Sequence, residues 1–248
     1  MKTKERHQLK ENDLAALIAS AGATFEAHRG RLALILVITL VAAAAAGGFL
    51  AWRGQTSVRA ERLLAEAMVA FNARVVPVSA EPTQPGEVPA AATIGATGTF
   101  ATEAAKLNAA LPKLRAAADA YPDTGAGITA RYHYASSLAA LGRHDEAIRA
   151  FDEVARRAGG NSLYARMSRL GKADTQMRAG QLDAAIATWK ELASSSDDEL
   201  PKDAMLMELA RAYQAAGKTE EAKKTFTQII DEHPTSPYMA EARAALGS

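Results

Sequence analysis

The sequence contains no cysteine, which excludes disulfide bonds, thiolate metal ligands, cysteine nucleophiles and a lipid-modified cysteine anchor. Aromatic residues make up only 6% of the 248 residues, whereas alanine and other strong helix formers recur throughout. Neither sign of charge is in excess, with 29 Lys and Arg against 28 Asp and Glu, so we expect no nucleic-acid partner. The composition predicts an all-α protein.

The sequence also lacks the motifs typical of catalysis. Its five histidines are widely separated, and neither a His-Glu-x-x-His nor a Gly-x-Ser-x-Gly pattern occurs. The segment AYQAAGKT, residues 212–219, matches a relaxed phosphate-loop pattern, but a helix rather than a strand is predicted before its glycine. We therefore expect no enzyme activity, no metal and no cofactor.

One long apolar run is present at residues 32–52, LALILVITLVAAAAAGGFLAW, with Arg31 before it and Arg53 after it. As a helix it spans about 31 Å, which matches a hydrocarbon core of about 30 Å. We interpret it as a transmembrane helix that contacts the lipid bilayer, with Trp52 at the far interface. Two alternatives stay open. The segment can be a cleaved signal peptide, because the run Ala42–Ala46 offers small-residue cleavage sites, or it can be a buried core helix.

Residues 1–31 form an N-terminal tail that is rich in basic side chains. Six Lys and Arg precede the span, against three just after it, which favours a cytoplasmic N-terminus. The tail can form an amphipathic helix on the membrane surface or a short solvated helix, and both interpretations stay open. Its apolar residues at helical spacing are Leu14, Leu17, Ile18, Ala21 and Phe25.

Two short segments follow the span. Residues 53–76 predict a stalk helix that continues from the membrane segment and has Ser57 as a possible N-cap. Residues 77–99 contain four prolines and three glycines and predict a linker. From residue 100 to 248 helical periodicity returns, and the sequence repeats itself.

The repeat rests on three aligned segments: ASSLAALGRHDEAIRAF from Ala135, ADTQMRAGQLDAAIATW from Ala173, and ARAYQAAGKTEEAKKTF from Ala210. Small residues let two helices approach closely, glycine permits the turn between them, and a bulky aromatic fills the space towards the next pair. The shared columns are Ala135, Ala173 and Ala210; Gly142, Gly180 and Gly217; Ala147, Ala185 and Ala222; and Phe151, Trp189 and Phe226.

These columns resemble the tetratricopeptide repeat. The resemblance implies a protein-binding α-solenoid of about three full repeats. A partial repeat ends at Pro122, and the stalk supplies its first helix; after Pro234 a capping helix runs through Leu246. In that helix Met239, Ala242 and Leu246 are expected to face the solenoid, with Glu241 and Arg243 outward.

In this family the first helices of successive repeats line a concave face, so the register predicts a protein-binding groove. Three methionines there would form an adaptable apolar surface, although packing inside the solenoid explains them equally well. The predicted groove residues are Tyr132, Ser136, Met167, Leu170, Asp174, Met177, Arg178, Met207, Arg211 and Gln214.

The order of tail, single span, stalk and small repeat domain resembles the bacterial ancillary subunit family of the SecYEG translocon. That resemblance implies an inner-membrane protein with periplasmic repeats that help exported chains reach chaperones. The proline-rich insert departs from the compact form of that family. The ending HPTSPYMAEARAAL also resembles repeats of Tol-Pal and outer-membrane assembly proteins, so a structural envelope scaffold stays open. The sequence indicates neither the partner nor the oligomeric state.

Overall fold

The computed structural model describes residues 4–76, 98–160, 162–195 and 199–247, with side chains from Ala33 onward and at Gly30. These ranges form two units, residues 1–55 and 56–248. The described helices are α1 (Lys4–Phe71), α3 (Glu103–Ala120), α4 (Gly125–Ala140), α5 (His144–Arg157), α6 (Leu163–Arg178), α7 (Leu182–Ser194), α8 (Lys202–Ala215), α9 (Thr219–Glu232) and α10 (Met239–Gly247). The protein is therefore all-α in these ranges.

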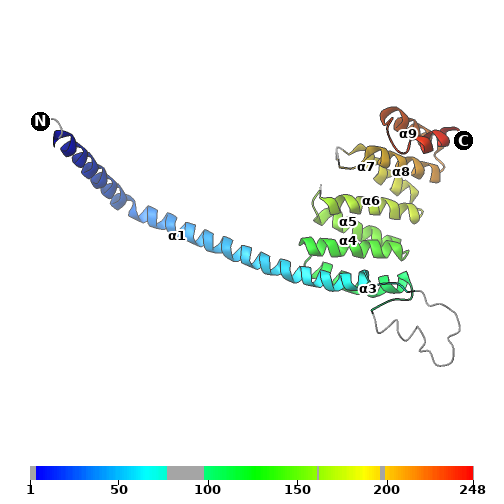
Figure 1. The fold of residues 1–248 in the computed structure, drawn as a ribbon, viewed down its shortest axis with the longest axis horizontal. Helices are drawn as coiled ribbons and strands as arrows, with labels where there is room; N and C mark the ends of the chain where they lie inside the picture. Colours follow the sequence, from blue (N-terminus) through cyan, green and yellow to red (C-terminus); the bar gives the residue numbers. More distant parts are fainter. Residues whose placement is uncertain (1–3, 77–97, 161, 196–198, 248) are drawn as a thin grey trace, which may run out of the picture. The chain divides into compact units, whose positions relative to one another are not determined.

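Helix α1 contains the apolar run and continues without a break into the predicted stalk (Figure 1). It ends at Phe71, five residues before the predicted end of the stalk, and Ser57 lies inside the helix instead of capping it. An uninterrupted helix leaves no free N-terminal amides at this point, so no cap is needed. The tail's amphipathic side chains, residues 1–29, lie outside the described side chains.

The apolar part of α1 is exposed to solvent. Leu36 is 61% exposed and Trp52 62%, and none of the apolar window from Ala33 is buried. A core helix of a water-soluble domain would be covered by other elements, so the buried-core interpretation is wrong for this segment. Among the described helices it is long and apolar enough to cross a membrane, and a signal sequence has the same length and composition.

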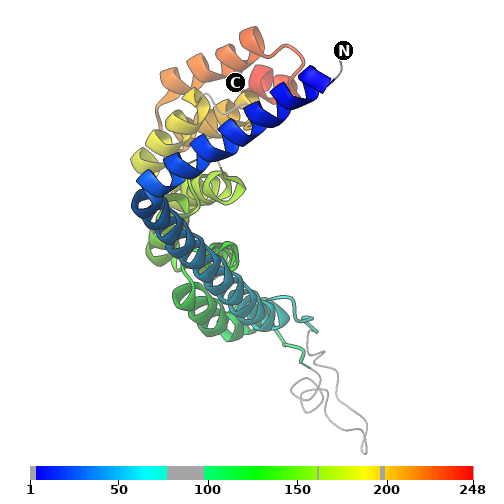
Figure 2. The ribbon, with the colours of Figure 1, turned by 90° about the vertical axis from the view of Figure 1, so that its left-hand side faces the viewer.

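The second unit is a stack of antiparallel helix pairs, in which α4 with α5, α6 with α7, and α8 with α9 make three full repeats (Figures 1 and 2). Each helix contacts the next one along the chain. The loops predicted around Gly159 and Ser194 separate these pairs, although Asn161 and residues 196–198 lie outside the described residues.

The three turns inside the repeats have the same backbone geometry. Gly142, Gly180 and Gly217 have φ values of 75°, 70° and 70°, which glycine adopts at little cost and other residues avoid. The amide that follows each glycine donates to the carbonyl five residues earlier at 2.9 Å, as in Arg143 to Leu138. This is the Schellman ending of a helix. The predicted glycine column therefore fixes the reversal of each pair.

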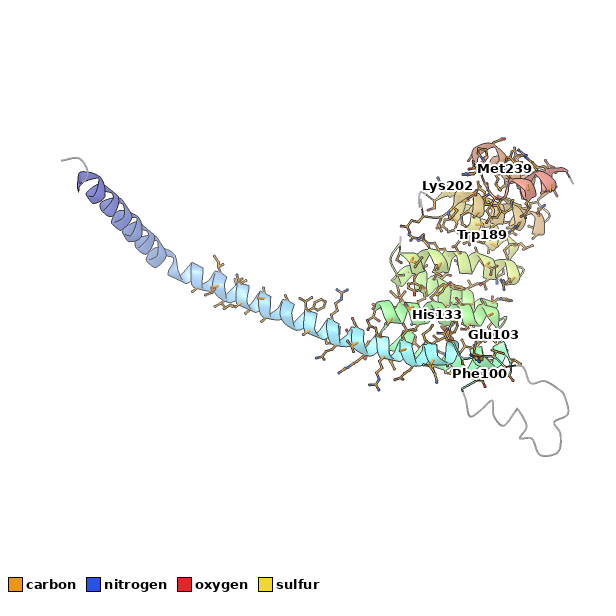
Figure 3. The ribbon with its side chains drawn as sticks, in the orientation of Figure 1. Phe100, Glu103, His133, Trp189, Lys202 and Met239 are labelled. Atoms are coloured by element: carbon orange, nitrogen blue, oxygen red, sulfur yellow. The ribbon has the colours of Figure 1, made fainter. Side chains whose placement is uncertain are left out.

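The other three columns form the interior of the stack. Ala135, Ala173 and Ala210 are fully buried, and Phe151, Trp189 and Phe226 are at most 5% exposed (Figure 3 labels Trp189). Burying a large apolar side chain stabilises the fold by about 1.5–3 kcal/mol. The prediction of paired helices packed through small and bulky residues is confirmed.

The partial repeat is completed by the last turns of α1. Ala67 and Ala70 form a buried cluster with Ala110 and Leu114 of α3. After α1, Val75 pairs with Phe100 in an isolated parallel bridge: Val76 donates to the Phe100 carbonyl at 2.8 Å, and Phe100 to that of Arg74 at 2.9 Å. The predicted linker thus ends before Phe100, and residues 77–97 lie outside the described residues.

Helix α10 caps the other end of the stack. Ala242 is fully buried against α8 and α9, as predicted, and Leu246 packs beside it. Glu241 does not simply point outward, because the Arg211 guanidinium on α8 donates to its carboxylate at 2.7 Å and 2.9 Å. The final helix is therefore held by both apolar packing and a paired charge.

Candidate protein-binding groove

The candidate groove is built on the first helices of the repeats, α4, α6 and α8. The Thr124 hydroxyl accepts a hydrogen bond from the Gly127 amide at 3.1 Å, and Ser162 does the same for Ala165 at 3.3 Å. Such N-caps stabilise a helix by about 1 kcal/mol. They fix where α4 and α6 begin, and therefore which side chains share a face.

At α4 the groove residue Tyr132 belongs to a group of aromatic rings in tilted or edge-on contact. The Tyr132 ring lies 5.5 Å from Tyr164, 6.0 Å from Phe151 and 5.6 Å from His133. His133 in turn lies 4.8 Å from Phe71 of α1 (Figure 3 labels His133). These rings link three successive first helices through aromatic contacts.

Beside Tyr132, the predicted groove residue Ser136 has its hydroxyl satisfied within its own helix, and the neighbouring His133, which was not predicted, is half-buried. The Ser136 hydroxyl donates to the Tyr132 carbonyl at 3.0 Å, inside the same helix. The half-buried His133 has a pKa lowered from its ordinary value of 6.5, because burial disfavours the charged imidazolium. At neutral pH this part of the groove is therefore uncharged.

The middle of the groove lies on α6. Met167, Leu170 and Met177 are all half-buried, and Leu170 and Met177 pack against the buried cluster around Trp189. Asp174 and Arg178 are exposed and form an ion pair at 2.9 Å within the helix. Met167 is thus the apolar groove side chain of α6 that lies outside this buried cluster, and the charged pair lies two to three turns beyond it.

On α8 the register prediction fails at one position. Met207 is fully buried, in the same cluster as Phe226 and Ala242, so it is a core residue and offers no contact surface. The reason is that α10 packs where a further repeat would stand and covers this side chain. For Met207 the alternative of core packing is correct, and for Met177 the half-buried position lies between the two interpretations.

The remaining α8 residues differ in availability. Arg211 pairs with Glu208 at 2.6 Å as well as with Glu241, so its charge is already balanced. Gln214 is exposed at the end of the helix. The accessible part of the predicted groove therefore consists of half-exposed and exposed side chains on α4, α6 and the end of α8: Tyr132, Ser136, Met167, Asp174, Arg178 and Gln214.

The sequence interpretation missed several residues that shape this surface. Tyr164 contacts Tyr132 but lies at the start of α6, outside the groove register, and Phe71 reaches His133 from α1. Glu241, expected to face outward, balances Arg211. The α1 contact needed the three-dimensional packing.

Two tetratricopeptide-repeat family models match the chain, one at residues 101–162 and the other at residues 177–246. The chain is a tetratricopeptide-repeat protein. The matched ranges include the first and third repeats of the stack, and the three glycine turns within them, Gly142, Gly180 and Gly217, have the expected geometry. The predicted repeat family is confirmed.

The repeat protein is similar to crystal structures of nearly identical TPR-like repeats from a protein described as a kinesin light chain of Podosopora anserina, and of a single-substitution variant. For both, identity is 18%, the TM-score is 0.49, and the match covers 57% of this chain and 76% of the other. No curated protein matches the repeat protein.

The rejected phosphate-loop pattern occupies a helix end and a turn in the repeat protein. Ala212 lies in α8, Gly217 in the turn and Thr219 at the start of α9, while the Lys218 ammonium donates to Asp183 at 2.8 Å. A helix thus precedes the glycine where a phosphate cradle needs a strand. Within the described residues, no group of three potential metal-ligating side chains is brought together.

Proposed function

We propose that this chain is a membrane-anchored protein-binding scaffold, whose repeats hold an apolar segment of a partner protein against α4 and α6. The proposal rests on the apolar side chains that the first helices do not bury completely. The side chains of the repeat columns are buried in the interior, whereas Tyr132 and Met167 are only half-buried, on neighbouring first helices. A flexible thioether beside an aromatic ring suits partner segments of varied shape.

Charged residues flank this apolar part of the groove. Asp174 and Arg178 are exposed on α6, and Gln214 is exposed on α8. Polar groups at the edge of an apolar contact orient a partner more than they strengthen its binding. We therefore expect an apolar peptide with polar flanks, bound with modest affinity, and no catalysis.

The anchor is residues 32–52, which would hold the repeats at a bilayer with the N-terminus in the cytoplasm. The exposure of this run along α1 and its basic lead support the assignment. With a periplasmic repeat domain, the resemblance to the ancillary SecYEG subunits makes the translocon and newly exported chains the first partners to test. A structural scaffold in division, Tol-Pal or outer-membrane assembly is the second candidate.

Photocrosslinking from the groove tests the function. A photoreactive amino acid is placed at position 136 or 167 of the full chain in membranes of the native host, with position 220 on α9 as an exposed control. We expect protein adducts from 136 and 167 and fewer from 220, identified by mass spectrometry. Equal labelling from all three positions would argue against a groove. SecYEG adducts favour the translocon, and division or assembly proteins favour the second candidate.

A further inference from the structure

A polar pocket of about 240 Å³ lies between α3, α4 and α5. Most of its lining is charged, and the pair Ala118 and Ala150 supplies the apolar part. The charged and hydroxyl groups are Arg115, Asp119, Arg131, Tyr134, Glu146, Arg149 and Glu153. The lining thus contains three guanidinium groups and three carboxylates, and their formal charges cancel.

The pocket is separate from the groove. On α4 it uses Arg131 and Tyr134, whereas the groove uses Tyr132 and Ser136. At about 100° of rotation per residue, the two pairs point roughly 150° apart around the helix axis. A ligand in this pocket therefore occupies a different side of the stack from a peptide in the groove.

All three carboxylates of the pocket already have partners. Arg131, whose side chain is only 11% exposed, donates to Asp119 at 2.8 Å and to Glu153 at 2.6 Å. Arg143 forms two hydrogen bonds to Glu146, at 2.7 Å and 2.8 Å. The negative charge of the lining is thus balanced by neighbouring guanidinium groups.

Several hydrogen-bond donors of the pocket lining lack a partner among the residues that the structure describes. Within the described residues, Arg149 makes no ion pair or hydrogen bond, and neither does the Tyr134 hydroxyl. The Nε of Arg131 is buried without a hydrogen-bond partner. The groups left over in the pocket lining are therefore N–H and O–H donors, and a matching ligand must present acceptor oxygens.

We propose that this pocket binds a carboxylate carried by an acidic segment of a partner protein, with the Arg149 guanidinium and the Tyr134 hydroxyl as donors. A planar carboxylate accepts two parallel hydrogen bonds from one guanidinium. Because the formal charges of the lining cancel, no net positive field offsets the repulsion between its three carboxylates and an anion, and this repulsion is weaker for a singly charged carboxylate than for a doubly charged phosphate. A carboxylate on a protein segment also gains from contacts beyond the pocket, which a free small acid lacks.

The test is fluorescence anisotropy with the full chain in detergent at low salt. The probe is a heptapeptide of three glutamates and four alanines with an uncharged dye, and its glutamine counterpart is the reference. We expect the glutamate peptide to bind at least tenfold more tightly. Arg149→Gln should weaken it tenfold or more, and Tyr134→Phe about fivefold, as expected for one charged and one neutral donor.

Arg156→Gln is the matched control, because Arg156 is exposed on the same helix and does not line the pocket. It should change binding less than twofold, and so should the groove variant Arg178→Gln. Equal binding of the two peptides, an unchanged affinity in Arg149→Gln, or an equal loss in Arg156→Gln would overturn the proposal.

Competition distinguishes the source of the anion. Acetate at matched ionic strength should displace the peptide in the millimolar range or above, with phosphate no better. Displacement by phosphate at tenfold lower concentration would overturn the carboxylate assignment. Thermal melts of Arg149→Gln should match those of Arg156→Gln, which shows that a lost affinity is not a lost fold.

Discussion

At the scale of single residues, Gly171 of α6 is fixed by its contact with Phe151. A Cβ atom at this position would lie 2.7 Å from the Phe151 ring, which is itself 3% exposed and packed in the buried core of the first repeat. We predict that Gly171→Ala destabilises the repeat domain by about 1–3 kcal/mol through overpacking. That cost exceeds the gain of roughly 1 kcal/mol from the helix preference of alanine. Chemical denaturation followed by circular dichroism measures the change.

Gly125, the first residue of α4, supplies the control because a Cβ there meets nothing within 4 Å. Gly125→Ala should leave the free energy of unfolding unchanged or raise it slightly. If both alanine variants were equally stable, the close packing of Phe151 against α6 would be contradicted.

The His133 side chain predicts a pH dependence of stability. Burial lowers the pKa of His133 below 6.5 in the folded state, whereas the unfolded chain keeps the ordinary value. The stabilising difference is present above pH 6.5. As the pH falls below this value the unfolded state binds the proton first, and stability decreases.

His133→Phe keeps a ring against Phe71 but cannot bind a proton. The variant should lose less stability than the native chain between pH 7.5 and pH 5.5, measured as the shift in urea midpoint. Identical pH slopes for the two proteins would show that His133 does not contribute.

The columns of small and bulky residues were predictable from the sequence because each residue repeats a local steric need. The groove residues were less predictable from the sequence. Tyr132, Leu170 and Met207 occupy the same register position, yet Tyr132 and Leu170 are half-buried and Met207 is fully buried, because burial depends on what packs on the next first helix. Register alone does not contain that information, and it therefore counted Met207 as surface.

At the scale of elements, the hold on α10 can be tested through its charged clamp. Arg211 of α8 donates to Glu241 of α10 through Nε at 3.1 Å and through its terminal nitrogen at 2.7 Å. Because these side chains are 41% and 50% exposed, the pair contributes only about 1 kcal/mol. We predict that Arg211→Ala increases hydrogen exchange in residues 239–247 and leaves α4 and α5 unchanged.

Arg178→Ala is the matched control for this variant. Its partner Asp174 lies on the same helix, so breaking that ion pair releases no neighbouring element. Exchange in α10 should stay at the native rate. Faster exchange of α10 in both variants would mean that the clamp is not what holds it.

The elements were predicted best where a local signal marks both ends. The glycine turns marked the ends of the first helices from the sequence, whereas the hydroxyl caps Thr124 and Ser162 were found only in the structure. The start of the stalk helix was harder to predict, because Ser57 is a good N-cap residue by type but lies within an unbroken helix. The role of α1 as the first helix of the partial repeat was expected, because α3 would otherwise expose its apolar side.

At the scale of the whole molecule, the sequence determines two properties that need no partner: an apolar run and a repeating helical pair. Both follow from residues that are close in the chain. The partner does not follow, because the accessible groove contains few side chains and these are chemically permissive. A polar pocket such as that around Arg149 is formed by α3, α4 and α5 together and was found only in three dimensions.

Residues 32–52 can anchor the repeats at a bilayer only if they remain in the mature chain. Alkaline carbonate extraction of host membranes, followed by intact mass and N-terminal sequencing, tests this directly. We predict that the chain stays in the membrane pellet and retains the residues before position 32. Recovery in the soluble fraction, with a new N-terminus within or just after residues 42–46, would show a cleaved signal peptide and contradict the anchor.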